Sequence, residues 1–185
     1  MIEPSELHKL VRPEWRWLLD LLEEADPEAV YEGINTDPLA RPRRKTILTA
    51  YLTDPCDHNR SVVIWSRMSW TNKLTFRGWT PCYIIFDVSD PEAKMSFLHE
   101  LGHLAASYLG QADFSDSGTV RNEMSAWRGV VTIMKPGAIP EAEIMNDFRD
   151  SLGGYFRLNG LDRRKLKRLK RIEPFRINSK QEIIC

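Results

Sequence analysis

The sequence has few of the residues that would place the protein outside the ordinary soluble class. Its three cysteines, Cys56, Cys82 and Cys185, are odd in number and fit neither a disulfide framework nor a cysteine-based zinc site. No stretch approaches the roughly eighteen consecutive apolar residues of a membrane-spanning helix. Glu3 and Glu6 come early and no apolar core follows, which is not typical of a secretory signal. These absences predict a cytoplasmic protein without a membrane span.

An excess of charge of one sign is also missing, because 26 basic residues balance 26 acidic residues. The whole chain therefore gives no electrostatic argument for binding nucleic acid or a membrane, and any such argument must be local. The length of 185 residues and a hydrophobic content of 42% are ordinary for one globular domain. We expect this domain to span residues 1–160, with residues 161–185 as a basic C-terminal tail or helix.

Apolar and β-branched residues gather in four segments that predict strands. The segments are 45–53, 61–68, 73–79 and 82–88, and Thr80-Pro81 is expected to break the chain between the last two. Strands in such short succession predict a small mixed or antiparallel sheet. Because helical patterns follow, the expected fold class is α+β.

The remaining patterns have the apolar spacing of helices. Helices are expected over 13–22, 91–109, 119–134 and 140–152, with Gly153-Gly154 as a breaker after the last. The capping sequence Ser89-Asp90-Pro91-Glu92 marks the start of the second helix. A polar loop joins the second helix to the third, so these two are expected to pack antiparallel.

His99, Glu100 and His103 form the pattern HExxH on the helix predicted over 91–109. The spacing of four places both imidazoles on one helix face, one turn apart, where they can chelate Zn²⁺. Glu100 would lie beside the ion and take a proton from a water that the metal activates. The alternative interpretation is a chance pattern, with two surface histidines on an amphipathic helix.

A catalytic zinc site has three protein ligands and one open position. The other two histidines, His8 and His58, both precede the pattern, so no downstream histidine can be the third ligand. Glu123, near the start of the next predicted helix, is the candidate. Ala126, one turn further on, is small and leaves room beside the histidines. Glu123 could instead be an ordinary first-turn glutamate that the helix dipole stabilises.

The segments His99-Glu100-Leu101-Gly102-His103 and Asn122-Glu123-Met124-Ser125-Ala126 resemble the gluzincin metallopeptidases. Within that group the likeness is greatest to the compact ImmA/IrrE-type proteases, and it covers about residues 82–136. The resemblance implies a zincin-like fold, with the small sheet packed on the helix of the motif. It also implies a zinc site of His99, His103 and Glu123, Glu100 as general base, and regulatory cleavage of a protein or peptide substrate.

Two positions depart from the thermolysin-like pattern. Trp127 stands where an aspartate would support a histidine ligand. No histidine follows His103 to stabilise an oxyanion, which leaves Tyr155, Arg157 or Arg128 for that role. Tyr155 is favoured because a phenol can donate to a developing oxyanion, although a tyrosine after two glycines is also typical of packing.

The substrate side offers two further segments. An extended peptide is expected to pair with an edge strand beside the motif, and 73–79 is the candidate. Seven basic residues in 161–171 could contact nucleic acid or an acidic partner, or form a solvated helix face.

The leading hypothesis is a cytoplasmic zinc metallopeptidase. The alternatives are a non-catalytic zinc-binding module that contacts nucleic acid or a protein, and a hydrolase of non-peptide amides or esters.

Overall fold

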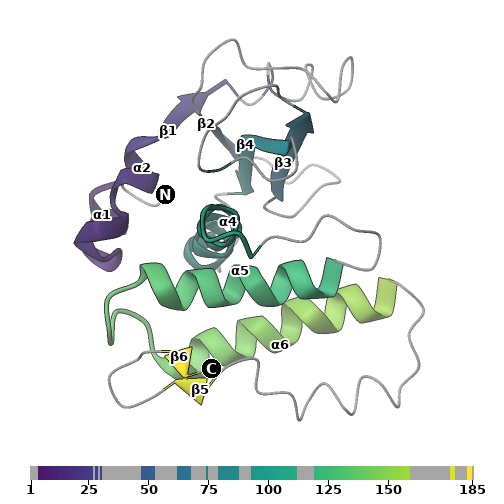
Figure 1. Cartoon of the computed structure of the whole chain (residues 1–185). Helices are drawn as coiled ribbons and strands as arrows, with labels where there is room; N and C mark the ends of the chain where they lie inside the picture. Colours follow the sequence, from purple (N-terminus) through teal and green to yellow (C-terminus); the bar gives the residue numbers. More distant parts are fainter. Residues whose placement is uncertain are drawn as a thin grey trace.

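The described part of the chain is arranged in layers around one central helix, α4 (Ala93–Tyr108) (Figure 1). The computed structural model describes residues 4–26, 28, 30, 47–52, 62–67, 74, 79–87, 93–111, 119–158, 176–177 and 183–184. A sheet lies on one side of α4, and α5 (Thr119–Ile133) lies on the other. The third layer is α6 (Glu141–Leu158), which packs on the far side of α5.

The sheet has four strands and is mixed. They are β1 (Leu22–Ala25), β2 (Ile47–Leu52), β3 (Val62–Arg67) and β4 (Trp79–Asp87), in the spatial order β1-β2-β4-β3. β1, β2 and β4 run parallel, and β3 lies antiparallel to β4 at the edge. The expected mixture of helices and strands is therefore confirmed. The sequence predicted either a mixed or an antiparallel sheet, and the sheet is mixed.

Thr80-Pro81 was expected to separate two strands, but both residues lie inside the single strand β4. The register between β3 and β4 shifts after Ile64, so that Trp65 is opposite Pro81 and Cys82 has no partner in β3. A proline has no N–H to donate, and strands tolerate it at such irregularities. Of the strand predicted over 73–79, only Leu74, in a turn, and Trp79, the first residue of β4, are among the described residues.

The helical prediction for residues 13–22 is only partly right. A 3-10 helix (Pro13–Trp15) and α2 (Trp17–Asp20) follow α1 (Pro4–Leu10), but the chain then enters β1. β1 is a strand because it pairs with a distant segment, with Leu22 opposite Ile47. Such pairing leaves no mark on the local sequence, which here is leucine-rich and acidic.

The glycine pair at 153–154 does not end α6, which continues to Leu158. A glycine inside a helix costs about 1 kcal/mol relative to alanine, so two of them weaken a helix without forbidding it. α6 packs along α5, and tertiary packing supplies most of the stability of a helix in a folded protein.

α4 is enclosed on nearly all sides, since every residue from Met95 to Ser107 is buried or half-buried. Its apolar residues form the centre of the core, and Phe97, Leu98, Leu101 and Leu104 are at most 1% exposed. The same position brings polar groups inside, where they need partners. Ser107, for example, donates a 2.7 Å hydrogen bond to the carbonyl oxygen of Leu74.

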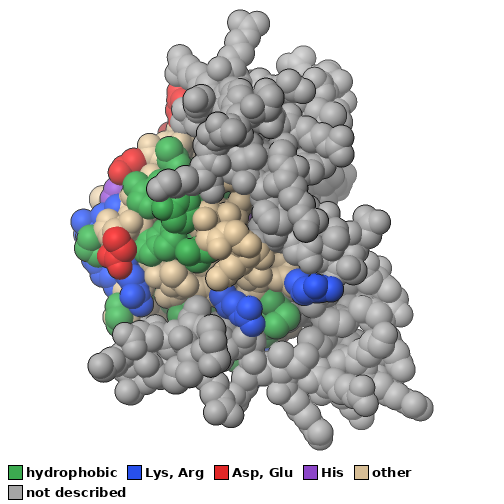
Figure 2. Space-filling view, in the orientation of Figure 1, with side chains coloured by type: hydrophobic (Ala, Val, Ile, Leu, Met, Phe, Trp, Pro, Cys, Tyr) green, Lys and Arg blue, Asp and Glu red, His purple; other side chains and the backbone are tan. Residues whose placement is uncertain are grey.

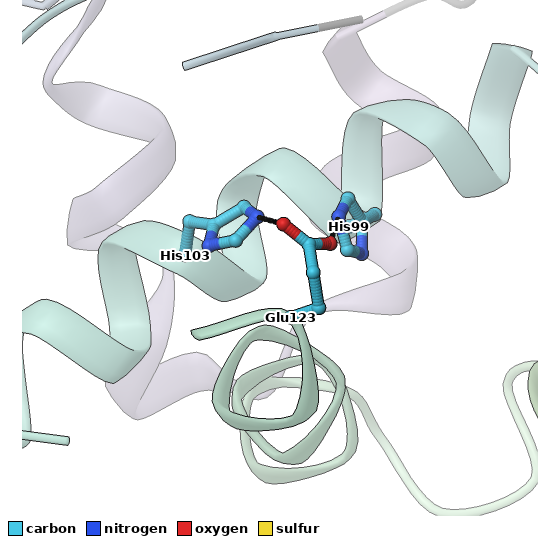
Figure 3. Close-up of side chains that lie close together, drawn as sticks. All are labelled: His99, His103 and Glu123. Atoms are coloured by element: carbon cyan, nitrogen blue, oxygen red, sulfur yellow. Dashed lines mark ion pairs between the residues drawn. The ribbon is translucent and has the colours of Figure 1, made fainter. Parts of the chain in front are cut away.

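The second and third predicted helices, α4 and α5, do not pack antiparallel. Figure 1 shows α4 end-on with α5 lying across it, and Figure 3 shows the reverse, so the two helices cross steeply. At the crossing, Gly102 of α4 lies against the carbonyl oxygen of Ala126, and Gly129 of α5 lies against the carbonyl oxygen of Gly102. A Cβ atom at either glycine would overlap that oxygen. The missing side chains thus let the two backbones approach closely.

We expect Gly102→Ala to destabilise the protein by about 1–3 kcal/mol, as overpacking of a core does. In an isolated helix the same change would stabilise by about 1 kcal/mol, so the sign of the effect reports the crossing. Urea unfolding of the metal-free protein measures it. A midpoint equal to or above that of the wild type would contradict the close approach of the two helices.

The N-terminal segment is fastened to the far end of α5. The backbone N–H of Arg12 donates to the carbonyl of Ile133 at 2.7 Å, and the N–H of Lys135 donates to the carbonyl of Leu10 at 2.8 Å. Arg12 Nε also donates to the carbonyl of Met134 at 2.6 Å. Val11 and Met134 form an isolated antiparallel bridge between these bonds. Residues 10–12 and 133–135 therefore make a short clasp.

Aromatic rings join the N-terminal segment to the end of α4. Trp17 and Tyr108 lie 4.9 Å apart between ring centroids, and Trp15 meets Tyr108 edge-on at 5.6 Å. These rings are only half-buried, and Figure 2 shows hydrophobic side chains gathered on this face of the molecule. They extend the core outward to the surface.

The C-terminal part contains a small second sheet, in which β5 (Arg176–Ile177) pairs antiparallel with β6 (Ile183–Ile184). β6 contacts α5. The basic segment 161–171 lies outside the described residues, so its predicted contacts with nucleic acid or an acidic partner stay a prediction. No described helix has both the length and the apolar character needed to cross a membrane.

Candidate metal centre

Three side chains from two helices meet at the steep crossing. His99 and His103 project from successive turns of α4, and Glu123 projects between them from α5 (Figure 3). His99 Nε2 lies 2.9 Å from Glu123 Oε2, and His103 Nε2 lies 3.5 Å from Glu123 Oε1. Their possible ligand atoms all lie within 4.8 Å of one another. The residues predicted from the sequence as metal ligands are thus close enough to hold one ion.

The spacing of these atoms fits a metal ion. Ligand atoms bound tetrahedrally at 2.0–2.1 Å from an ion are about 3.3 Å apart. The separations of 2.9 and 3.5 Å are of this size, although each involves a different oxygen of Glu123. Glu123 Oε2 is buried and, despite the short contact with His99, takes part in no hydrogen bond of acceptable geometry. The set of two imidazoles and one carboxylate suits a transition-metal ion.

The charges at the site stabilise one another. Burial alone would raise the pKa of Glu123, but the imidazoles of His103 and His99 outweigh it and hold that pKa far below its ordinary value. Burial alone would lower the pKa of His103, but Glu123 and the charge of Glu100 outweigh it and raise that pKa. Without a metal, a proton on the His103 imidazole therefore supplies positive charge next to the Glu123 carboxylate.

Glu100 is a fourth buried polar group beside the three. It is 4% exposed, and burial raises the pKa of its carboxyl, an effect that His99 and His103 only partly oppose. The carboxyl also accepts a hydrogen bond from the backbone N–H of Val63 in β3. Glu100 therefore lies between the three candidate metal ligands and the edge strand β3.

The contact between Glu100 and Val63 was not predicted from the sequence. The spacing of a helix places Glu100 next to His99, but it says nothing about which strand lies over that helix. The signal for β3, an apolar segment at 61–68, was present without any sign that this strand is at the edge. Edge position depends on strand order, and here the chain order and the spatial order of β3 and β4 differ.

The predicted oxyanion donors are placed only in part. Tyr155 and Arg157 lie in the last turns of α6, but their side chains are not among the parts of the chain that the structure describes. Arg128 is exposed on α5, while His103 and Glu123 are buried. The role proposed for Tyr155 therefore stays a prediction. Trp127, the residue in place of the expected aspartate, is 2% exposed and lies against His99.

The metal-free protein should lose stability as the pH rises from about 6.5 toward 8. His103 has a raised pKa in the folded state, so its stabilisation is complete below the ordinary value of 6.5 and is lost above it. The raised pKa of Glu100 acts in the same direction, because its charging in the core costs stability above 4.5. The lowered pKa of Glu123 adds stability that is present above 4.5 and lost only in acid.

Thermal unfolding in a chelator between pH 5 and 8.5 measures this dependence. A bound metal ion should reverse it, because metal binding requires unprotonated imidazoles and tightens as the pH rises. A melting temperature that climbs steadily from pH 6 to 8 without metal would contradict the charge arrangement.

In comparisons with known proteins, no family model, no curated protein and no solved structure matched this chain.

Proposed function

We propose that the protein is a zinc-dependent hydrolase of peptide bonds with a zincin-like arrangement of its site. The observation that supports this most directly is the meeting of His99, His103 and Glu123 with a buried Glu100 beside them. Two histidines and a carboxylate are a ligand set of catalytic zinc, and they leave a fourth position open. The likeness of the two motif segments to gluzincins points the same way.

Glu100 favours a catalytic site over a structural one. A structural zinc site is closed by four protein ligands, whereas the described residues bring three ligands together here. A buried carboxylate that is not needed as a ligand costs stability, because its charge is removed from water. Its presence is explained if it handles a proton during a reaction.

Zinc, when bound, supplies Lewis acidity toward a scissile carbonyl and makes a water acidic enough to lose a proton near neutral pH. Glu100 takes that proton, and because burial raises its pKa it is a stronger base than an ordinary glutamate, which suits a general base. The same carboxyl can then return the proton to the leaving amine. Glu123 would contribute the negative charge with which the two imidazoles hold the cation.

The edge strand offers a place for the substrate. β3 is at the edge of the described sheet, and the amide of Val63 reaches Glu100, so a peptide extended along β3 passes the general base. Pairing with an edge strand supplies backbone hydrogen bonds that do not depend on the peptide's sequence. We therefore assign to β3 (Val62–Arg67) the role expected earlier of residues 73–79.

A metal-content and hydrolysis experiment tests the proposal. The purified chain should hold one zinc ion per molecule and cleave members of a fluorogenic peptide library. A chelator should abolish cleavage, and added Zn²⁺ should restore it. A chain that takes up no stoichiometric metal would refute the metal centre. A chain that binds zinc at full occupancy but cleaves no peptide would refute the proposed reaction.

A further inference from the structure

His99 lacks the hydrogen bond that usually fixes a metal-binding histidine. A histidine that binds metal through one ring nitrogen normally donates from the other nitrogen to a carboxylate, carbonyl or water, which sets the plane of the ring. Here Nε2 faces Glu123, while Nδ1 is buried and has no hydrogen-bond partner among the described residues. The orientation of this imidazole needs another explanation.

The side chain of Trp127 in α5 packs directly against the His99 ring. It follows Glu123 by four residues, so both side chains are on one face of α5, one turn apart. The centroids of the Trp127 and His99 rings are 4.9 Å apart, and the ring planes are inclined by 43°. The indole is therefore in direct packing contact with the imidazole.

The indole is itself held in place from the layer beyond. Phe148 of α6 meets Trp127 edge-on, with 6.5 Å between the ring centroids and 87° between the planes. Both aromatic residues are almost fully buried. Trp127 thus contacts both His99 of α4 and Phe148 of α6, two helices that lie on opposite sides of α5 in Figure 1. Dense packing leaves such a ring little freedom to turn.

The polar atom of Trp127 has no part in this arrangement. The indole Nε1 is buried and, within the described part of the chain, donates to no acceptor. Nε1 also cannot accept a proton from His99, because an indole nitrogen is a donor only. What Trp127 offers His99 is therefore the packing of its ring, and not a hydrogen bond.

We propose that Trp127 is the positioning residue of His99 and fixes the imidazole for metal binding by ring packing instead of a hydrogen bond. This inference rests on the proposed metal centre. It has a chemical consequence, because a carboxylate partner would raise the basicity of the imidazole, and a ring does not. The bound cation consequently keeps more of its positive charge than in a site with the usual aspartate.

Cobalt binding by the full chain tests this role, because the visible absorption of Co²⁺ reports ligand geometry independently of activity. Trp127→Leu should weaken Co²⁺ affinity about 10- to 100-fold, the usual cost of losing a partner of a ligand, and should shift the absorption bands. Trp127→Phe keeps a ring at this place and should restore values close to the wild type. Trp17→Leu removes a tryptophan that packs on Tyr108 at the end of α4 and should leave both unchanged.

A second variant covers the case in which Trp127→Leu does not fold. Phe148→Leu removes the outer support of the indole without touching His99, and it should shift the bands and weaken affinity to a smaller extent. Wild-type affinity and bands in Trp127→Leu, or in Phe148→Leu if the first variant does not fold, would overturn the role of Trp127. Absence of Co²⁺ binding by the wild type would instead overturn the metal centre itself.

Discussion

Glu100→Gln should abolish nearly all hydrolysis while leaving one metal ion bound per molecule. The amide is nearly the same size as the carboxyl but cannot take a proton from water, and general-base catalysis contributes about 10²–10⁴-fold to a rate. Metal binding should persist because Glu100 is not among the three ligands. The measurement is kcat/KM on a cleaved peptide, together with metal content.

The same substitution should make the protein slightly more stable above pH 4.5. Burial raises the pKa of Glu100, so the folded state is penalised when this carboxyl is charged, and a neutral amide removes the penalty. Loss of activity combined with equal or higher stability would separate catalysis from folding. Glu143→Gln, at an exposed position of α6, is the matched control and should change neither. Retention of more than a tenth of the activity would rule out Glu100 as the base.

Glu123→Gln should have the second large effect, on metal affinity. The change removes the only charged ligand of the three, and we expect zinc affinity to fall by at least about 100-fold, beyond the usual cost of losing an outer partner of a ligand. At a zinc concentration about 100 times the wild-type Kd, a 100-fold loss of affinity lowers the ligand-induced stability from about 2.7 to about 0.4 kcal/mol. Competition with a chromophoric chelator measures the affinity, and thermal unfolding with and without zinc measures the stability.

Two outcomes are informative for Glu123. If affinity falls and the metal-induced rise in melting temperature disappears, the helix crossing is a metal centre. If zinc still raises the melting temperature of Glu123→Gln by as much as that of the wild type, the ion is bound elsewhere. Glu143→Gln again serves as the control, since it removes a glutamate from the surface and should keep the full zinc effect.

More of the candidate metal centre than of the fold could be predicted from the sequence. His99, Glu100 and His103 share one helix, and helical periodicity is local, so their relative placement follows from spacing alone. The prediction of Glu123 as the third ligand depended on one further assumption, that the next helix folds back onto the helix of the histidines. That assumption succeeded although the predicted antiparallel packing was wrong, because Gly102 and Gly129 allow a steep and close crossing that still brings Glu123 to the histidines.

The errors share a physical cause, which is dependence on distant parts of the chain. β1 is a strand because residues 22–25 pair with residues 47–50, and Pro81 lies in a strand because the register shifts opposite Trp65. Strand order, and with it the edge position of β3, is likewise a property of the assembled sheet. Local patterns of apolar and β-branched residues find the strands without ordering them.

The clasp between residues 10–12 and 133–135 has a consequence for the order of folding. Arg12 and Met134, joined by one of its hydrogen bonds, are 122 positions apart, so the clasp closes a very long loop. The histidines and Glu123 are separated by far less chain, and shorter loops close at a lower entropic cost. Contacts between nearby parts of a chain also form sooner. We therefore expect α4 and α5 to meet, and to be able to take up their ion, before the first dozen residues dock.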